Sequence, residues 1–180
     1  MIKQIYIISS FALMTLISSS IYANDLYQKR VITPTSKTVL INALYDGHKK
    51  VFKTTPNYKR LAMALAQINL ENGHGKKIYN HNLGNVGPRR TQKVPYFILG
   101  GSKFMAHKSF LQGAVGYWHH LKVVCSGALP YFSTGRPVVA GYRLRACNYY
   151  TSPKVKYSRL LNILYQSAFK RVQNTPPSSR

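Results

Sequence analysis

The strongest pattern in the sequence is a run of apolar residues at helical spacing between residues 58 and 68. Leucine, alanine, methionine and glutamine fill this stretch, and all are good helix formers. Pro56 and Asn57 precede the run, and Gly73 and Gly75 follow it as an ordinary C-terminal stop. The pattern predicts a core helix, and any fold of this chain must bury its apolar face.

Weaker helical patterns and one hairpin surround this helix in the sequence. Thr35 or Ser36 is placed to cap a helix, and Ser109 is placed to cap another that carries Trp118. Further helices are predicted at residues 138–145 and 156–171, and a hairpin at residues 94–106 turns at the Gly-Gly-Ser run. Residues 76–93 and 125–137 read as loop, with a helical turn near residues 131–132. The expected class is mainly α (α+β), with a small β-hairpin lobe.

The N-terminal 23 residues have the features of a secretory signal peptide. A charged start at Lys3 leads into an apolar run that ends in serines and Ala23. The alternative is an uncleaved membrane anchor, since the apolar stretch is near spanning length. We expect an irregular leader over residues 24–34, one domain over residues 35–172 and a disordered tail over residues 173–180. After cleavage no stable membrane anchor is expected, which predicts a secreted or periplasmic protein.

The charge balance points to a polyanionic partner. The chain has 26 Lys and Arg against three acidic residues, a net charge of +23. Such a charge favours cell wall, anionic envelope surface or nucleic acid. The bases are spread along the chain and 45% of residues are hydrophobic, so a folded core is expected rather than a disordered basic arm.

Two cysteines, Cys125 and Cys147, are the only ones in the chain. In an exported protein an even pair predicts a disulfide. Two buried free thiols are the alternative.

Glu71 is the acid whose position is unusual. Asp25 lies beside the expected cleavage site and Asp46 near the end of the first helix, whereas Glu71 ends the core helix. The negative end of the helix dipole and burial both raise the pKa of a carboxyl, as a general acid requires, while nearby cations lower it. A surface Glu paired with a Lys is the alternative. In a chain almost without acids, the functional interpretation is favoured.

At this point several segments resemble a known family. Residues 65–75, ending in Glu-Asn-Gly-His-Gly, resemble the catalytic helix of the lysozyme-like superfamily, and most of all that of glucosaminidase-type bacterial peptidoglycan hydrolases. Residues 79–86 are similar to the family's Asn-Asn-Leu-Phe-Gly-Ile segment, with the Phe missing. Residues 104–110 and the helix that carries Trp118 resemble the family's hairpin return and the helix after it. Residues 147–153 with Tyr157 resemble its Tyr-Ala-Thr-Asp segment, with Ser152 in place of Asp. The likeness covers roughly residues 57–165.

The resemblance implies a lysozyme-like helical domain and a role for each matching residue. Glu71 would protonate the glycosidic oxygen, and Tyr149 or Tyr150 would lie beside the cleaved linkage. The substrate-binding residues would be Asn82, Gly84, Asn85, His74 and His81. An ordinary Asx-rich turn is the alternative for the Asn82 region, and packing is the alternative for the tyrosines.

One departure from a two-carboxylate glycosidase is clear, because no acid follows Glu71 in the chain. We therefore expect a single-carboxylate mechanism. The substrate's N-acetyl group could serve as nucleophile, Glu71 could act as acid and then base to form an anhydro sugar as lytic transglycosylases do, or a polar group could position water.

The histidines carry no metal-binding pattern, and no acid is free to orient a His beside a nucleophile, so neither metal nor cofactor is expected. The expected protein is a monomeric peptidoglycan glycosidase, without a nucleic-acid partner. A non-catalytic cationic binder of cell wall or nucleic acid on a lysozyme-like scaffold is the main alternative. A toxin that disrupts membranes by charge is the weaker one.

Overall fold

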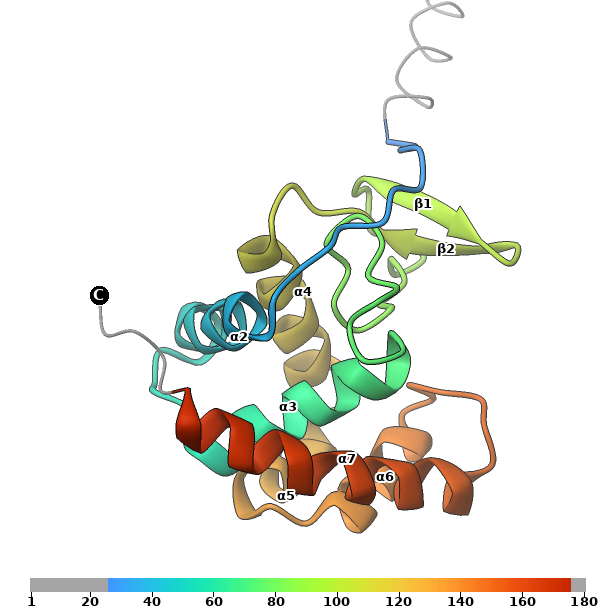
Figure 1. Cartoon of the computed structure of the whole chain (residues 1–180). Helices are drawn as coiled ribbons and strands as arrows, with labels where there is room; N and C mark the ends of the chain where they lie inside the picture. The colour runs from blue at the N-terminus through green and yellow to red at the C-terminus, as the bar shows by residue number, and fades with distance from the viewer. Residues whose placement is uncertain (1–25, 176–180) are drawn as a thin grey trace, which may run out of the picture.

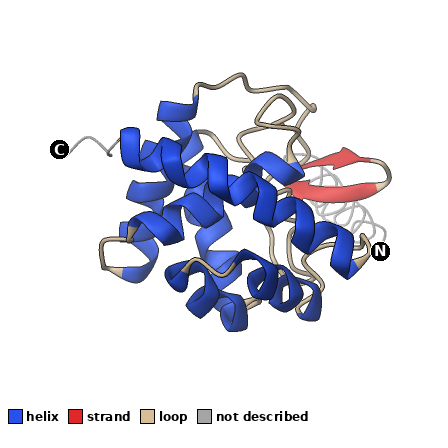
Figure 2. Cartoon of the chain, turned by 60° about the horizontal axis from the view of Figure 1, so that its bottom comes forward, coloured by secondary structure: helices blue, strands red, loops and turns tan. Residues whose placement is uncertain are grey.

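The structure, a computed structural model, describes residues 26–175, in which several helices surround one buried helix and a hairpin stands to one side (Figure 1). In chain order the elements are α2 (Lys37–Phe52), α3 (Tyr58–Glu71), β1 (Tyr96–Leu99), β2 (Ser102–Met105), α4 (Phe110–Val123), the 3-10 helix η1 (Ser126–Ala128), α5 (Leu129–Thr134), α6 (Pro137–Ala146) and α7 (Lys154–Asn174). The mainly helical α+β class expected from the sequence is confirmed (Figure 2).

Polar side chains start the first long helices as the sequence predicts. The side chains of Ser36, Asn57 and Ser109 each accept a hydrogen bond from a backbone N–H in the first turn of α2, α3 and α4. These bonds satisfy donors that have no partner within the helix.

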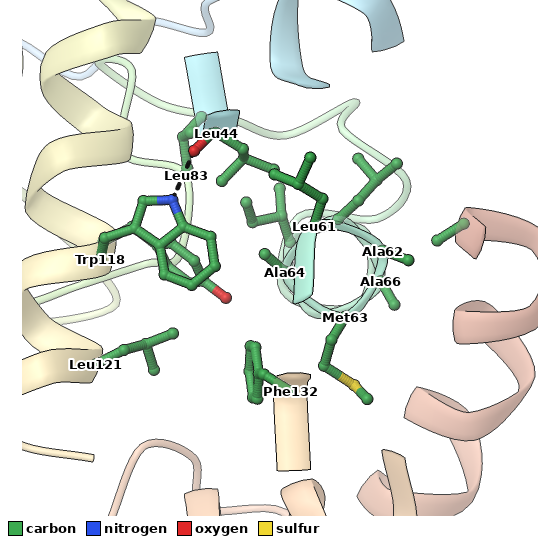
Figure 3. Close-up of a cluster of buried hydrophobic side chains, with 14 of the residues drawn as sticks. Leu44, Leu61, Ala62, Met63, Ala64, Ala66, Leu83, Trp118, Leu121 and Phe132 are labelled. Atoms are coloured by element: carbon green, nitrogen blue, oxygen red, sulfur yellow. Dashed lines mark hydrogen bonds between the residues drawn. The ribbon is translucent and has the colours of Figure 1, made fainter. Parts of the chain in front are cut away.

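The core is built around α3. Every residue from Leu61 to Asn69 is buried, so this helix is covered on all sides. It packs against α7, α5 and α2, while α2 packs against α4. The Trp118 indole N–H of α4 donates to the Leu44 carbonyl of α2 over 2.8 Å, which joins these two helices inside the core (Figure 3).

The hairpin pairs β1 with β2 in antiparallel register, with Tyr96 opposite Met105 and Leu99 opposite Ser102. Gly100 and Gly101 make the turn with positive φ, which glycine adopts without a Cβ penalty. The leader segment docks on this lobe: Gln28 N–H donates to Tyr96 O, and Tyr96 N–H donates to Leu26 O, each over 2.7 Å. The described part of the leader is thus irregular but tied to the hairpin.

The structure departs from the expected boundaries in two places. The 125–137 segment, expected as loop, contains η1 and α5, because Pro130 stands at the start of α5, where its missing N–H is harmless. Helix α7 continues to Asn174, two residues into the expected tail, because its amphipathic pattern extends to the buried Val172. The expected signal peptide and the rest of the tail lie outside the described residues. Within residues 26–175, none of the helices combines the length and apolar character needed to cross a bilayer.

The predicted disulfide between Cys125 and Cys147 is present, with a Cα–Cα distance of 5.4 Å. It joins the end of the α4 segment to the C-terminal end of α6. A crosslink over a sequence separation of 22 residues contributes about 3 kcal/mol in the chain-entropy model.

Gly113 generates a testable prediction about how α4 meets the loop before the hairpin. A Cβ on Gly113 would collide with the backbone carbonyl oxygen of His81. Because a backbone atom cannot swing aside, we expect Gly113→Ala to lower the free energy of unfolding by about 1 to 3 kcal/mol, measured by urea titration.

Gly127→Ala is the matched control, since a Cβ there meets nothing within 4 Å. Its free energy of unfolding should stay within about 1 kcal/mol of the wild type. Equal values for the two variants would contradict the close approach of α4 to the loop.

Candidate active site

Glu71 is the last residue of α3, and the chain leaves the helix directly after it. Asn72 ends the helix, and Gly73, His74 and Gly75 then adopt positive φ. This left-handed run turns the chain away, so the Glu71 side chain is left at the open end of the buried helix. In Figure 1 this end of α3 lies on the same side of the molecule as the hairpin and the loop between α6 and α7.

Asparagine side chains bind the 82–86 loop to the end of α3. Asn72 donates to the Leu83 carbonyl, and Asn85 donates to the Glu71 carbonyl over 3.0 Å. Asn82 is 1% exposed, and its amide donates to the Val86 and Met105 carbonyls. These bonds fix the backbone of the loop beside the carboxyl group of Glu71.

The side chain of Glu71 lies in a pocket of about 530 Å³ between the hairpin lobe and α7. The end of α3, the loop residues Gly84 and Asn85, Phe104 of β2 and the 148–160 segment form its wall. Among residues 26–175, Glu71 is the only acid that lines it. The pocket therefore offers one carboxyl group among aromatic and polar neighbours.

Three tyrosines line this pocket, and each hydroxyl has a defined acceptor. Tyr157 donates to Glu71 Oε1 over 2.7 Å, and Tyr149 donates to the Gly84 carbonyl over 2.7 Å. Tyr150 donates to the Gly141 carbonyl over 2.9 Å, while its ring stacks on Tyr157 with centroids 3.5 Å apart. The Tyr150 ring thereby holds Tyr157 in the orientation that reaches Glu71.

Burial shapes the electrostatics of the site. Desolvation raises the pKa of Glu71, and the hydrogen bond from Tyr157 opposes that shift because it stabilises the carboxylate. Desolvation together with the neighbouring charge of Glu71 raises the pKa of Tyr157 well above its usual value. Tyr157 is therefore a neutral hydroxyl donor throughout the neutral range, facing a carboxyl that is displaced toward its protonated form.

Gly84 shows how tightly the floor of the site is packed. A Cβ on Gly84 would collide with the Tyr149 hydroxyl and with the ring of Tyr117. Tyr117 in turn donates to Gln67 Oε1 over 2.6 Å, one turn before Glu71 on α3. The loop backbone, two tyrosines and α3 thus form one close-packed layer under the pocket.

The structure brings together five of the residues that the sequence singled out. Glu71, Gly84, Asn85, Tyr149 and Tyr150 line the pocket. Three other predicted substrate-binding residues lie elsewhere: Asn82 is used inside the loop, His74 is exposed on the turn after α3, and His81 bonds the His107 carbonyl through Nδ1. None of these three lines the pocket.

Tyr157 is the residue to which the sequence assigned no role. It lies in a predicted helix with apolar residues, where a tyrosine is interpreted as part of the core. The resemblance names Tyr157 beside residues 147–153 without giving it a role, and Tyr157 lies one helical turn after Pro153, which caps α7 beside the pocket.

No group of three or more His, Cys, Asp or Glu within residues 26–175 is arranged to hold a metal ion. The pocket can donate or accept a proton at one carboxyl group, which one tyrosine orients. Aromatic rings form the wall beside that carboxyl group.

The raised pKa of Glu71 predicts a pH-dependent gain of stability in Glu71→Gln. The folded-state pKa lies above the unfolded one, so the stability associated with the protonated form is complete below the unfolded pKa and is lost as pH rises through the folded pKa. We expect the melting temperature of Glu71→Gln to exceed that of wild type at pH 8, with the difference shrinking toward pH 4.

Asp46→Asn is the matched control, because Asp46 is exposed on α2 and the substitution removes the same charge. It should show no gain that grows with pH. A Glu71→Gln melting temperature that runs parallel to wild type from pH 4 to pH 8 would contradict the burial of an ionisable Glu71.

Comparison with known proteins gives a fold. No protein-family model and no curated protein matches the chain. The crystal structure of a peptidoglycan hydrolase from Sphingomonas sp. A1 is similar, with TM-score 0.57 and 18% identity over 79% of this chain and 97% of the other. A variant of that hydrolase with a glutamate changed to alanine matches with TM-score 0.56 and 17% identity, over 79% of this chain and 99% of the other. Residues 26–175 thus have the lysozyme-like α+β fold that the sequence predicts.

Proposed function

We propose that this protein is an exported peptidoglycan glycosidase that cleaves β-1,4 linkages of the cell-wall glycan with Glu71 as general acid. The observation that carries the proposal is the Glu71 carboxyl itself. It ends a buried helix, its pKa is raised by desolvation, and it opens into a pocket of about 530 Å³. The similar solved structures are peptidoglycan hydrolases, which supports this substrate class.

The hydrogen bond from Tyr157 defines which oxygen of Glu71 delivers the proton. Oε1 accepts from the Tyr157 hydroxyl, so the proton of the neutral acid resides on the other oxygen. Glu71 transfers that proton to the glycosidic oxygen as the bond between this oxygen and the anomeric carbon breaks. The Tyr157 hydroxyl then stabilises the carboxylate that remains.

Tyr149 is the residue proposed to face the developing positive charge at the anomeric carbon. Its hydroxyl hydrogen is committed to the Gly84 carbonyl, so the free lone pair of its oxygen is available on the pocket side. Tyr150 supports the site through its stack on Tyr157, rather than through its own hydroxyl, which bonds Gly141.

The second half of the reaction proceeds without a second carboxylate. A retaining two-carboxylate site needs its nucleophile about 5 Å from the acid, and an inverting one needs a base about 6.5 to 9.5 Å away. In the part of the chain that the structure describes, Glu71 is the only acid lining the pocket. The attacking group is therefore the substrate's own N-acetyl group, its 6-hydroxyl group acting with Glu71 as base, or a water held by polar groups of the wall.

Export and wall binding complete the proposal. The disulfide suits an oxidising compartment, and the excess of positive charge would hold the enzyme to an anionic wall by attraction that salt screens. The proposed localisation is secreted or periplasmic, and the finer group is the glucosaminidase type.

The decisive test is digestion of purified sacculi, followed as loss of turbidity. Because the acid is removed while its shape is kept, Glu71→Gln should lower the rate by about 10²- to 10⁴-fold. Asp46→Asn, the matched loss of one carboxyl on exposed α2, should retain the wild-type rate.

Clearing that persists in Glu71→Gln would exclude Glu71 as the acid. Sacculus binding without clearing by wild type would favour the non-catalytic binder. Mass spectrometry of the fragments separates hydrolysis from anhydro-sugar formation, and glucosaminidase from muramidase cleavage.

Tyr157 is a positioning residue, and its test is the pH profile of the rate. Its hydrogen bond lowers the pKa of Glu71, so Tyr157→Phe should move the alkaline limb of the turnover number to higher pH. Tyr150→Phe keeps the ring stack and loses only the bond to Gly141, so its alkaline limb should stay in place. An unmoved limb in Tyr157→Phe would contradict the assignment.

A further inference from the structure

A second and larger hollow, of about 770 Å³, is lined by Gly87, which follows Asn85 of the Glu71 pocket by two residues. Its walls are the 87–95 segment, the 105–109 turn after β2 and the face of α4 that carries Leu111 and Val115. Nothing in the proposed reaction at Glu71 uses it.

The rim of this hollow is basic. Lys50, Arg89 and Lys108 line it and are exposed. His107, His119 and His120 line it too, and burial lowers the pKa of His107 to about 4 and also lowers that of His120. The positive charge therefore comes from the lysines and the arginine, while the imidazoles of His107 and His120 are neutral hydrogen-bonding groups. Neither Asp46 nor Glu71, the two acids of the described residues, lines the hollow.

The floor is aliphatic. Val94, Leu111 and Val115 line it, and no Phe, Tyr or Trp of residues 26–175 does. Bases and sugar rings bind on aromatic faces, which this floor does not offer. An aliphatic floor under a cationic rim instead suits a ligand with small apolar side chains and carboxylates.

The hollow adjoins the Glu71 pocket. Gly84 and Asn85 line the pocket, and Gly87 lines the hollow. Tyr149 lines the pocket, and its ring packs edge-on against His120 of the hollow with centroids 5.5 Å apart. A branched ligand bound at Glu71 thus has a short path over the 84–87 segment to the basic rim.

We propose that this hollow binds a short peptide bearing carboxylates and small apolar side chains. Resting on the proposed function, this peptide is the stem that hangs from the muramic acid of the glycan strand. Arg89 and Lys108 bind its carboxylates, and the floor formed by Val94, Leu111 and Val115 receives its alanine methyl groups.

The first test is calorimetric titration of the protein with N-acetyl-alanyl-γ-glutamyl-lysyl-alanine. We expect saturable binding, and weaker binding of the same peptide with both carboxylates amidated. Because each exposed charge contact is modest, Arg89→Gln with Lys108→Gln should weaken binding about fivefold. Lys59→Gln with Lys170→Gln is the control: it removes the same charge from exposed positions outside the hollow, and should leave the affinity unchanged.

The second test links the hollow to catalysis. The rates of wild type and of both double variants are measured on sacculi and on glycan strands from which an amidase has removed the peptides. The rate on sacculi divided by the rate on stripped strands should fall about fivefold in the Arg89 and Lys108 double variant. In the control double variant this ratio should equal that of wild type.

The peptide site is overturned if the peptide with free carboxylates and the amidated peptide bind equally well. It is also overturned if both double variants lose the same affinity for the peptide. Clearing that survives Glu71→Gln, or no clearing by wild type, overturns the proposed function instead, and the titration still decides whether the hollow binds peptide.

Discussion

Complete burial of α3 is the constraint on which the rest of the structure depends. Residues 61–69 are all buried, so other helices must cover every side of this helix, and only its ends can meet solvent. Its C-terminal end carries Glu71, so this carboxyl group lies where the buried core meets the pocket. The desolvation that raises its pKa is a consequence of where the helix stops.

Much of this could be predicted from sequence. The apolar periodicity and the caps at Ser36, Asn57 and Ser109 are local signals, and local physics decides them. The scarcity of acids draws attention to Glu71, because it is one of only three acidic residues in a chain of net charge +23 and the one that ends the core helix. The helices within residues 125–137 were underestimated because Gly and Pro, read as breakers, stand where helix ends tolerate them.

The missing parts of the site depend on contacts that are distant in sequence. Tyr157 reaches Glu71 across 86 residues, and no local pattern predicts such a pair. The resemblance predicts that Asn82 binds substrate, and in the structure its amide donates to the carbonyls of Val86 and Met105. The order of the motifs predicts a loop beside Glu71, and Gly84 and Asn85 of that loop line the same pocket as Glu71. Which side chains of the loop face the pocket and which face inward was decided by packing against α4 and the hairpin.

The place of the disulfide has a consequence for how the protein matures. Cys147 stands two residues before Tyr149, whose hydroxyl holds the loop at Gly84. The disulfide therefore links the backbone just before Tyr149, where the tyrosine-lined side of the pocket begins, to Cys125 after α4. Oxidation of the thiols and assembly of the pocket are thus coupled, and a freshly synthesised chain with reduced cysteines has a less constrained pocket wall than the finished protein.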